Sequence, residues 1–210
     1  MSFKLADIGL VFLVLLFTAC TNHSKDQKAA LSERDRQKLT NDLHQIYIDD
    51  QKSREKVSIY IEKYGIKSVE VANLGKEIAR NDSANLIVVK RIIKKYGWLS
   101  ADLVGERGNM ALFLVIQHAT KSDRKYFLPL MRAAVKNHAA SAKDLAFLED
   151  RVAEEEGKTQ IYGTQIGFDE KTNKYYILPI DNPNQVDQRR AKVGLPPLSV
   201  QRSEWQIEPN

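Results

Sequence analysis

The stretch GKTQIYGTQIGFDEKTNKYYILPI, from Gly157 to Ile180, differs from everything before it and decides the fold class. Its β-branched and aromatic residues flank the turn-rich segment DEKTN at 169–173, a pattern that is typical of a β-hairpin. The segments before it carry apolar residues at helical spacing. Two strands alone are marginally stable in water, so they need a surface to pack on. The sequence therefore predicts an α+β fold, a mainly helical bundle with a C-terminal β-hairpin packed against it.

Serine and glycine mark most of the predicted helix boundaries. Helices are expected to begin at Ser32 and Ser141 and to end at Gly65, Gly97 and Gly157. The helix that ends at Gly97 is expected to begin at Asp82. The segment NMALFLVIQHA at 109–119 is apolar nearly all round, which predicts a buried central helix.

The N-terminal region resembles that of bacterial lipoproteins. An unbroken apolar run covers residues 8–17, too short for the roughly 20 residues that span a bilayer but typical of a signal peptide. It leads into LFTAC, which is similar to the lipobox whose cysteine, here Cys20, is acylated and becomes the mature N-terminus. The alternative is a plain signal peptide with a chance cysteine. We expect a signal peptide over 1–19, a flexible tether over 20–30, one α+β domain over 31–200 and a tail over 201–210.

A lipid anchor on Cys20 restricts both chemistry and location. Cys20 is the only cysteine, so its acylation would exclude disulfides, thiolate metal sites and cysteine nucleophiles. We expect a membrane-anchored protein of the bacterial cell envelope. In a Gram-negative cell the following Thr21, in place of an aspartate, favours the outer membrane. The net charge of +5 is scattered among acids, so we expect no nucleic-acid partner.

Two helical segments carry residues that could perform chemistry. His118, at the end of the apolar segment, could act as a general base, or it could be a core histidine bonded to a carbonyl. Asp150 and Arg151 lie on the last helix, where a core-facing aspartate needs a partner. Arg151, Arg54 or His118 could supply that partner, or Asp150 could form an ion pair on a solvated face.

The segment QIYGTQ is the third candidate. If it is a strand, alternation places three polar residues on one face: Gln160, Tyr162 and Thr164. The other face then carries Ile161, Gly163 and Gln165. Such a polar row could recognise a sugar or a peptide, or could simply face solvent. Gly163 suggests a bulge or a close approach of another group to the backbone.

Several familiar signatures are missing from the sequence. It has no GxSxG, HExxH, P-loop, GxGxxG, EF-hand or CxxC motif, and its histidines lack metal-ligand spacing. We therefore expect no metal and no cofactor.

Eight motifs occur in a characteristic order: DQKSR (50–54), NDSAN (81–85), YGW (96–98), VGERG (104–108), QHA (117–119), LEDRV (148–152), GKTQIYGTQ (157–165) and DQRRAKVGLPPL (187–198). Over roughly residues 36 to 200 this set resembles the domain of unknown function 6624, an uncharacterised bacterial family. Leu99 departs from it, because a proline usually follows Gly-Trp. The resemblance implies that His118, Asp150–Arg151 and QIYGTQ belong to one recurring pattern, and it supplies no activity.

These observations predict a small polar pocket where the polar row of the hairpin meets the helix ends that carry His118 and Asp150. The candidate ligand-binding residues are Asp50, Arg54, Gln117, Arg151, Gln160, Tyr162, Thr164 and Gln165. We expect a lipoprotein that binds a polar small molecule, glycan, peptide or envelope protein. One alternative is a hydrolase-like enzyme in which His118 is the general base and Asp150 orients it. The other is a buried hydrogen-bond network that pins the hairpin to the bundle.

Overall fold

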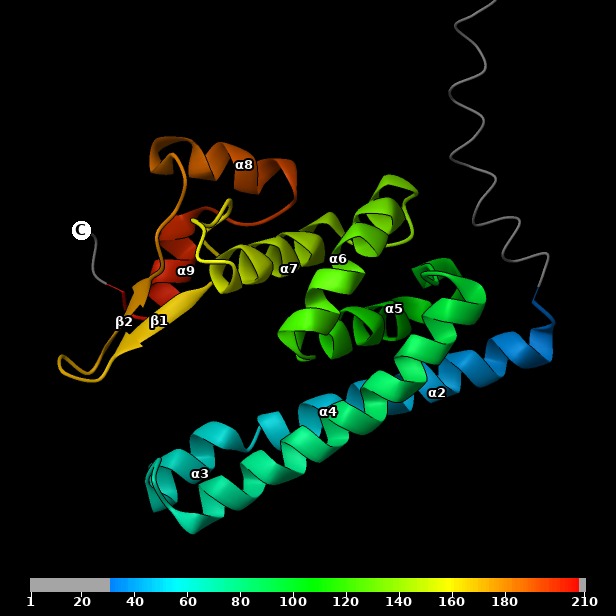
Figure 1. Ribbon diagram of the computed structural model, residues 1–210, viewed down its shortest axis with the longest axis horizontal. Coiled ribbons are helices and arrows are strands. Elements are labelled where there is room, and N and C mark those ends of the chain that lie inside the picture. The colour runs from blue at the N-terminus through cyan, green and yellow to red at the C-terminus, as the bar shows by residue number, and fades with distance from the viewer. Residues whose placement is uncertain (1–30, 208–210) are drawn as a thin grey trace, which may run out of the picture.

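The computed structural model describes residues 31–207 and shows a mainly helical chain with one antiparallel hairpin near its C-terminus (Figure 1), which confirms the predicted α+β class. The elements are α2 (Glu33–Arg54), α3 (Val57–Tyr64), α4 (Val69–Tyr96), α5 (Ala101–Gln117), α6 (Lys121–Lys136), α7 (Ala142–Glu155), β1 (Ile166–Asp169), β2 (Lys174–Ile177), the 3-10 helix η1 (Pro183–Gln185), α8 (Val186–Lys192) and α9 (Leu198–Glu204). The predicted signal peptide and tether, with Cys20, lie outside the described residues. Among the helices described, none combines the length and apolarity needed to cross a membrane.

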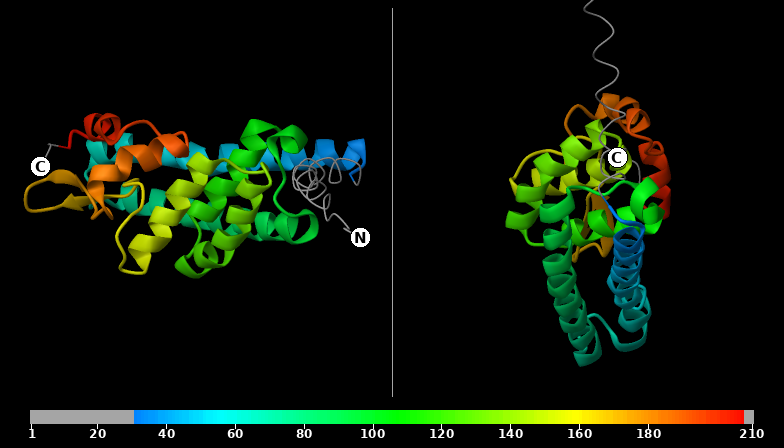
Figure 2. Two further views of the ribbon diagram at one scale, coloured as in Figure 1. Left: turned by 90° about the horizontal axis from the view of Figure 1, so that it is seen from above. Right: turned by 90° about the vertical axis from the view of Figure 1, so that its right-hand side faces the viewer.

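The helices α2 and α4 run side by side and are connected by the short α3, so the three form a projecting arm (Figures 1 and 2). Ser32 caps α2 as predicted, accepting the backbone N–H of Asp35 at 3.1 Å. The predicted helix start at Asp82 is wrong. Ser68 caps α4 instead, and Asp82 lies inside one continuous helix.

The helix α5 lies at the centre, in contact with α2, α4, α6 and α7. Its buried side chains confirm the prediction of a central apolar helix. The element extends back to Ala101 but is kinked at Gly105, whose backbone is not helical (φ 74°, ψ 165°). The core around it contains the fully buried Leu43, Val89, Leu112, Ile116, Met131 and Leu148. The core therefore fixes where the C-terminal ends of α2 and α5 meet the middle of α4.

Other predicted boundaries are also confirmed. The residues after α3 and α4 are Gly65 (φ 82°) and Gly97 (φ 73°), in a backbone region that glycine enters without a steric penalty. Ser141 accepts the N–H of Asp144 at 3.2 Å, and α7 ends just before Gly157.

The predicted end of the domain, residue 200, lies inside the helix α9, so this helix crosses the predicted boundary.

The hairpin is shorter than the sequence suggested. β1 and β2 pair from Ile166↔Ile177 to Asp169↔Lys174. The Tyr175 ring lies 5.0 Å from that of Phe168 and 5.1 Å from that of Trp205, centroid to centroid. Because Trp205 directly follows α9, aromatic contact ties the hairpin to this last helix.

Candidate functional site

Three chain segments that are far apart in the sequence meet at one group of charged side chains. The last turns of α2 contribute Asp50 and Arg54, the middle of α4 contributes Asp82, and His118 caps the C-terminal end of α5. We call these four residues the ionic cluster. They come from the DQKSR, NDSAN and QHA motifs, so the fold brings three of the eight motifs to one place.

The ionic cluster is built around a fully buried carboxylate. The Nδ1 atom of His118 lies 2.9 Å from Oδ1 of Asp50. Gln51 donates to Oδ2 of the same carboxylate at 2.7 Å. Arg54 lies between the two acids: its Nη2 donates to both oxygens of Asp82 at 2.9 and 2.8 Å, and its Nη1 is 3.4 Å from Oδ1 of Asp50.

The four residues differ in their access to solvent. Asp50 is completely buried, whereas the side chains of Arg54 and His118 are each 22% exposed and that of Asp82 is 19% exposed. No described group hydrogen-bonds Nε2 of His118, so this nitrogen remains available to a ligand. Asp50 thus holds the imidazole ring from the inside while the ring reaches the surface.

The neighbours of Asp50 keep its carboxylate charged despite burial. Burial raises the pKa of Asp50, but the hydrogen bond with His118 and the positive charges of His118 and Arg54 outweigh it, so the pKa lies below its usual value.

The same atoms could hold a metal ion. Asp50, Asp82 and His118 each offer one ligand atom, and these atoms lie within 4.8 Å of one another. Arg54 already supplies a positive charge between the two carboxylates, so a metal ion would have to displace its guanidinium. The absence of a metal therefore stays a prediction.

Asp150 lies in a different environment. It is completely buried, and its Oδ1 accepts the backbone N–H groups of Ile161 at 2.7 Å and Tyr162 at 3.0 Å. Its Oδ2 accepts the backbone N–H and the hydroxyl of Thr164 at 2.9 and 3.0 Å. The partner of His118 is therefore Asp50, and the expected His118–Asp150 pair does not form, because backbone donors already surround Asp150.

The expected polar row of a strand is wrong as well. Residues 160–165 form a loop around Asp150, with one isolated bridge between Gln160 and Ile180. Gln160 and Thr164 are buried and Tyr162 is half-buried, so the three do not form an open polar face, and Gln165 is buried as well. The Gln160 amide donates to the carbonyls of Gln165 and Leu178, and its Oε1 accepts the N–H of Gln165 at 2.6 Å.

The DQRRAKVGLPPL motif seals the other side of this loop. Arg190 is 1% exposed and donates to the carbonyls of Tyr162 at 2.8 Å and Pro196 at 2.7 Å. Gln201 donates to the carbonyl of Gly163 at 2.8 Å. The predicted close approach at Gly163 is confirmed, because a Cβ there would lie 2.5 Å from a methyl carbon of Ile180. We call Asp150, the loop 160–165, Arg190 and Gln201 the closed network.

The predicted site residues thus divide between two places. Asp50, Arg54 and His118 belong to the ionic cluster, beside Gln117, whereas Asp150, Gln160, Tyr162, Thr164 and Gln165 belong to the closed network. Arg151 follows Asp150 on α7, and its Nε is buried without a hydrogen-bond partner among the described residues. Sequence reasoning missed Asp82, Arg190 and Gln201. Asp82 was present in the NDSAN motif but was interpreted as a helix start.

Replacing Asp150 with asparagine tests the structural role of the closed network. The variant points an NH₂ group at backbone N–H donors, so we expect the free energy of unfolding to fall by about 3 kcal/mol, the cost of leaving buried donors unsatisfied. Urea denaturation measures the change, and Glu154→Gln, an exposed residue on the same helix, is the control. A loss no larger than that of the control would contradict this role.

The lowered pKa of Asp50 predicts a pH dependence of stability. A depressed carboxyl pKa contributes stability above the unfolded value of about 3.9, and this contribution is lost as the pH falls through the folded pKa. We therefore expect the wild type to be more stable than Asp50→Asn at pH 7 and the difference to shrink below about pH 4. Urea denaturation at several pH values measures it, and a difference that stays constant with pH would refute the assignment.

Comparison with known proteins places the chain in a family. The model of a family described as "Family of unknown function (DUF6624)" matches residues 39–203. The comparison with curated proteins gives no significant match, and neither does the comparison with solved structures. Because the match covers well over half of the sequence, the chain belongs to the DUF6624 family.

Proposed function

We propose that the protein is a membrane-tethered binding protein that holds a polar ligand at the ionic cluster. The observation that carries the proposal is the pair formed by the buried Asp50 and the partly exposed His118, which leaves Nε2 of His118 without a described partner. A histidine that served only the core would be enclosed and bonded at both ring nitrogens.

Two buried amide side chains beside the cluster add support. Asn85 lies one turn beyond Asp82 on α4, and Gln117 directly precedes His118. Nδ2 of Asn85 and Oε1 of Gln117 are buried without a hydrogen-bond partner among the described residues. Buried polar atoms rarely stay unpaired, so one additional donor and one additional acceptor from a ligand would complete the site.

The closed network, which contains Asp150 and the QIYGTQ segment, has no group available for a ligand. Every oxygen of the Asp150 carboxylate is occupied by groups of the loop 160–165, and Arg190 covers the loop. A fully satisfied and buried network offers nothing to a ligand. We therefore restrict the binding site to the ionic cluster and assign the closed network to stability.

The charge of the ionic cluster limits the ligand class. Two carboxylates face one guanidinium, so these four residues carry no net positive charge in either protonation state of His118. Glu77 adds a further carboxylate nearby, because it accepts the hydroxyl of Ser53 on α2 at 2.7 Å. An uncharged or cationic polar group, such as the hydroxyls and amides of a glycan or the amine of a peptide, fits this charge.

A second candidate function is hydrolysis, favoured by the distance of 2.9 Å between His118 and Asp50. A buried carboxylate that orients an imidazole is the arrangement in which the other ring nitrogen can take a proton from water. His118 would be the general base and Asp50, in place of Asp150, the residue that positions it.

Ligand titration followed by histidine NMR tests the binding proposal. The probes are chitotriose, an alanyl-lysine peptide and citrate, and the signal is the ring resonance of His118, assigned with His118→Gln. We expect a shift with the uncharged or the cationic probe, and an affinity at least about tenfold weaker in Asp50→Asn and Asp82→Asn, because each loses a charged partner. Asp49→Asn, the neighbouring carboxylate, is the matched control.

Two results would decide against this function. Binding of citrate alone would contradict the charge argument. If Asp50→Asn and Asp82→Asn bind the probes as tightly as the wild type, the ligand does not bind at the ionic cluster. Turnover of a bound probe that is lost in His118→Gln would favour the hydrolase.

The membrane tether is part of the same proposal and is supported by the LFTAC sequence that ends at Cys20. Acylation would hold the domain at the bacterial cell envelope, and at the outer membrane in a Gram-negative cell. We expect Cys20→Ser to accumulate as the unprocessed precursor and to incorporate no labelled palmitate. Unchanged palmitate labelling in the variant would exclude this anchor.

A further inference from the structure

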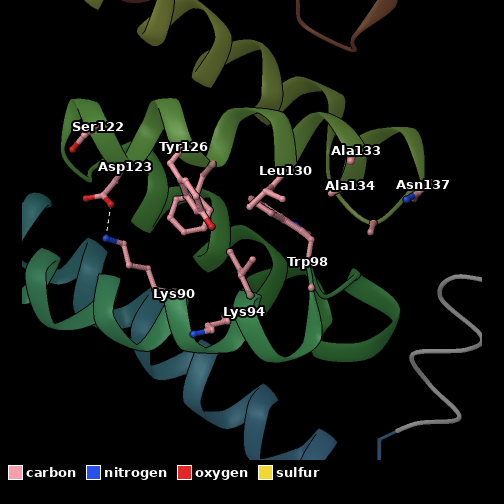
Figure 3. A pocket seen from close by; sticks show the side chains of 14 residues that line it. Lys90, Lys94, Trp98, Ser122, Asp123, Tyr126, Leu130, Ala133, Ala134 and Asn137 are labelled. Atoms are coloured by element: carbon pink, nitrogen blue, oxygen red, sulfur yellow. Dashed lines mark ion pairs between the residues drawn. The ribbon is translucent and has the colours of Figure 1, made fainter.

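A hollow lies on another part of the molecule, between the C-terminal half of α4 and α6 (Figure 3). It is a groove of about 870 Å³, within the range of small-molecule sites. Its walls are mainly apolar: Ile93, Trp98, Phe127, Leu130, Ala133 and Ala134. None of the four residues of the ionic cluster lines it.

The groove contains unusually exposed apolar surface. Tyr126 is 66% exposed and Leu130 is 41% exposed, one turn apart along α6. Beneath them, Phe127 and Ala134 are buried, and the small side chains of Ala133 and Ala134 leave the space open. A hollow with exposed aromatic and aliphatic walls is typical of a site for an apolar ligand group.

Charge is distributed unevenly along the rim. Lys90 pairs with Asp123 at one end, as Figure 3 shows, so this lysine is already neutralised. Burial raises the pKa of Asp123, but Lys90 and Thr120 outweigh it, and the carboxylate stays charged. Lys94 lies one turn further along α4 and forms no ion pair with any described residue. The rim therefore carries one uncompensated positive charge.

We propose that this groove binds a single-chain amphiphile, whose acyl chain lies along α6 and whose anionic head group meets Lys94. The mainly apolar walls suit a hydrocarbon chain, and the ammonium of Lys94, which pairs with no described acid, fits a carboxylate or a phosphate. Each methylene removed from water strengthens binding by up to roughly fourfold. The proposal does not rest on the polar ligand proposed for the ionic cluster, because none of the four cluster residues lines the groove.

Photoaffinity labelling of the full-length chain in cell membranes tests the proposal. The probe is a palmitate analogue that carries a diazirine and an alkyne, and mass spectrometry locates the label. We expect labelled peptides from residues 121–139, competed by added dodecanoate or dodecyl phosphate but not by dodecyltrimethylammonium. The stronger competitor of the first two identifies the head group as carboxylate or phosphate.

Three variants make the test specific. Ala133→Trp fills the groove from an exposed position, so the fold should persist while labelling there falls at least about tenfold. Lys94→Glu should reduce labelling about two- to fivefold, as expected for one exposed charge pair. Lys95→Glu is the matched control, since Lys95 is also exposed, lies next in sequence and does not line the groove.

The results that would overturn the proposal are equally defined. Labelling of residues 121–139 that survives Ala133→Trp would place the probe elsewhere. Equal competition by the cationic amphiphile, or equal effects of Lys94→Glu and Lys95→Glu, would contradict the proposal that an anionic head group binds Lys94. A dimer that dissociates in Ala133→Trp, measured by light scattering of the detergent-solubilised chain, would show that a second copy covers the groove.

Discussion

A carboxylate buried away from water must receive hydrogen bonds or positive charge on nearly every lone pair, and this requirement organises the whole structure. Asp50 and Asp150 are both completely buried. Asp150 meets the requirement with backbone N–H groups, which cannot titrate or move away without unfolding the loop 160–165. Asp50 meets it with the side chains of His118, Arg54 and Gln51.

This difference separates stability from function. A shell of backbone donors fixes one conformation, and Arg190 and Gln201 close it further by binding the loop carbonyls. A shell of ionisable side chains can exchange protons, change partners and reach solvent. The two carboxylates therefore impose the same physical demand, but only the one at the junction of α2, α4 and α5 leaves a group available for a ligand.

The parts of the fold that the sequence predicted correctly are those set by local interactions. Ser32 caps α2 through a contact only three residues along the chain, because its hydroxyl accepts the N–H of Asp35. Gly65 and Gly97 end helices through their own backbone conformation. In the same way the DEKTN turn is shaped locally, since Asp169 accepts the N–H of Lys171 at 2.9 Å and the hydroxyl of Thr172 at 2.9 Å.

The errors concern interactions between distant residues. QIYGTQ has the composition of a strand, but Asp150, 11 to 14 residues earlier, binds its N–H groups and curls it into a loop. His118 and Asp50 are 68 residues apart, so no local pattern could pair them. Asp82 looked like a helix cap because aspartate is a good one, and its true partner, Arg54, lies 28 residues away.

The helix α4 connects the two proposed sites. Asp82 faces the ionic cluster and Lys90 the groove, eight residues later, which is about 12 Å along a helix. The start of α6 also serves both, since Asp123 binds Lys90 while Arg124 donates to the carbonyl of Gln117 at 3.1 Å. An occupant of the groove that shifted this turn would alter the position of His118. Because such coupling is reciprocal, a ligand at His118 would change affinity in the groove by the same factor.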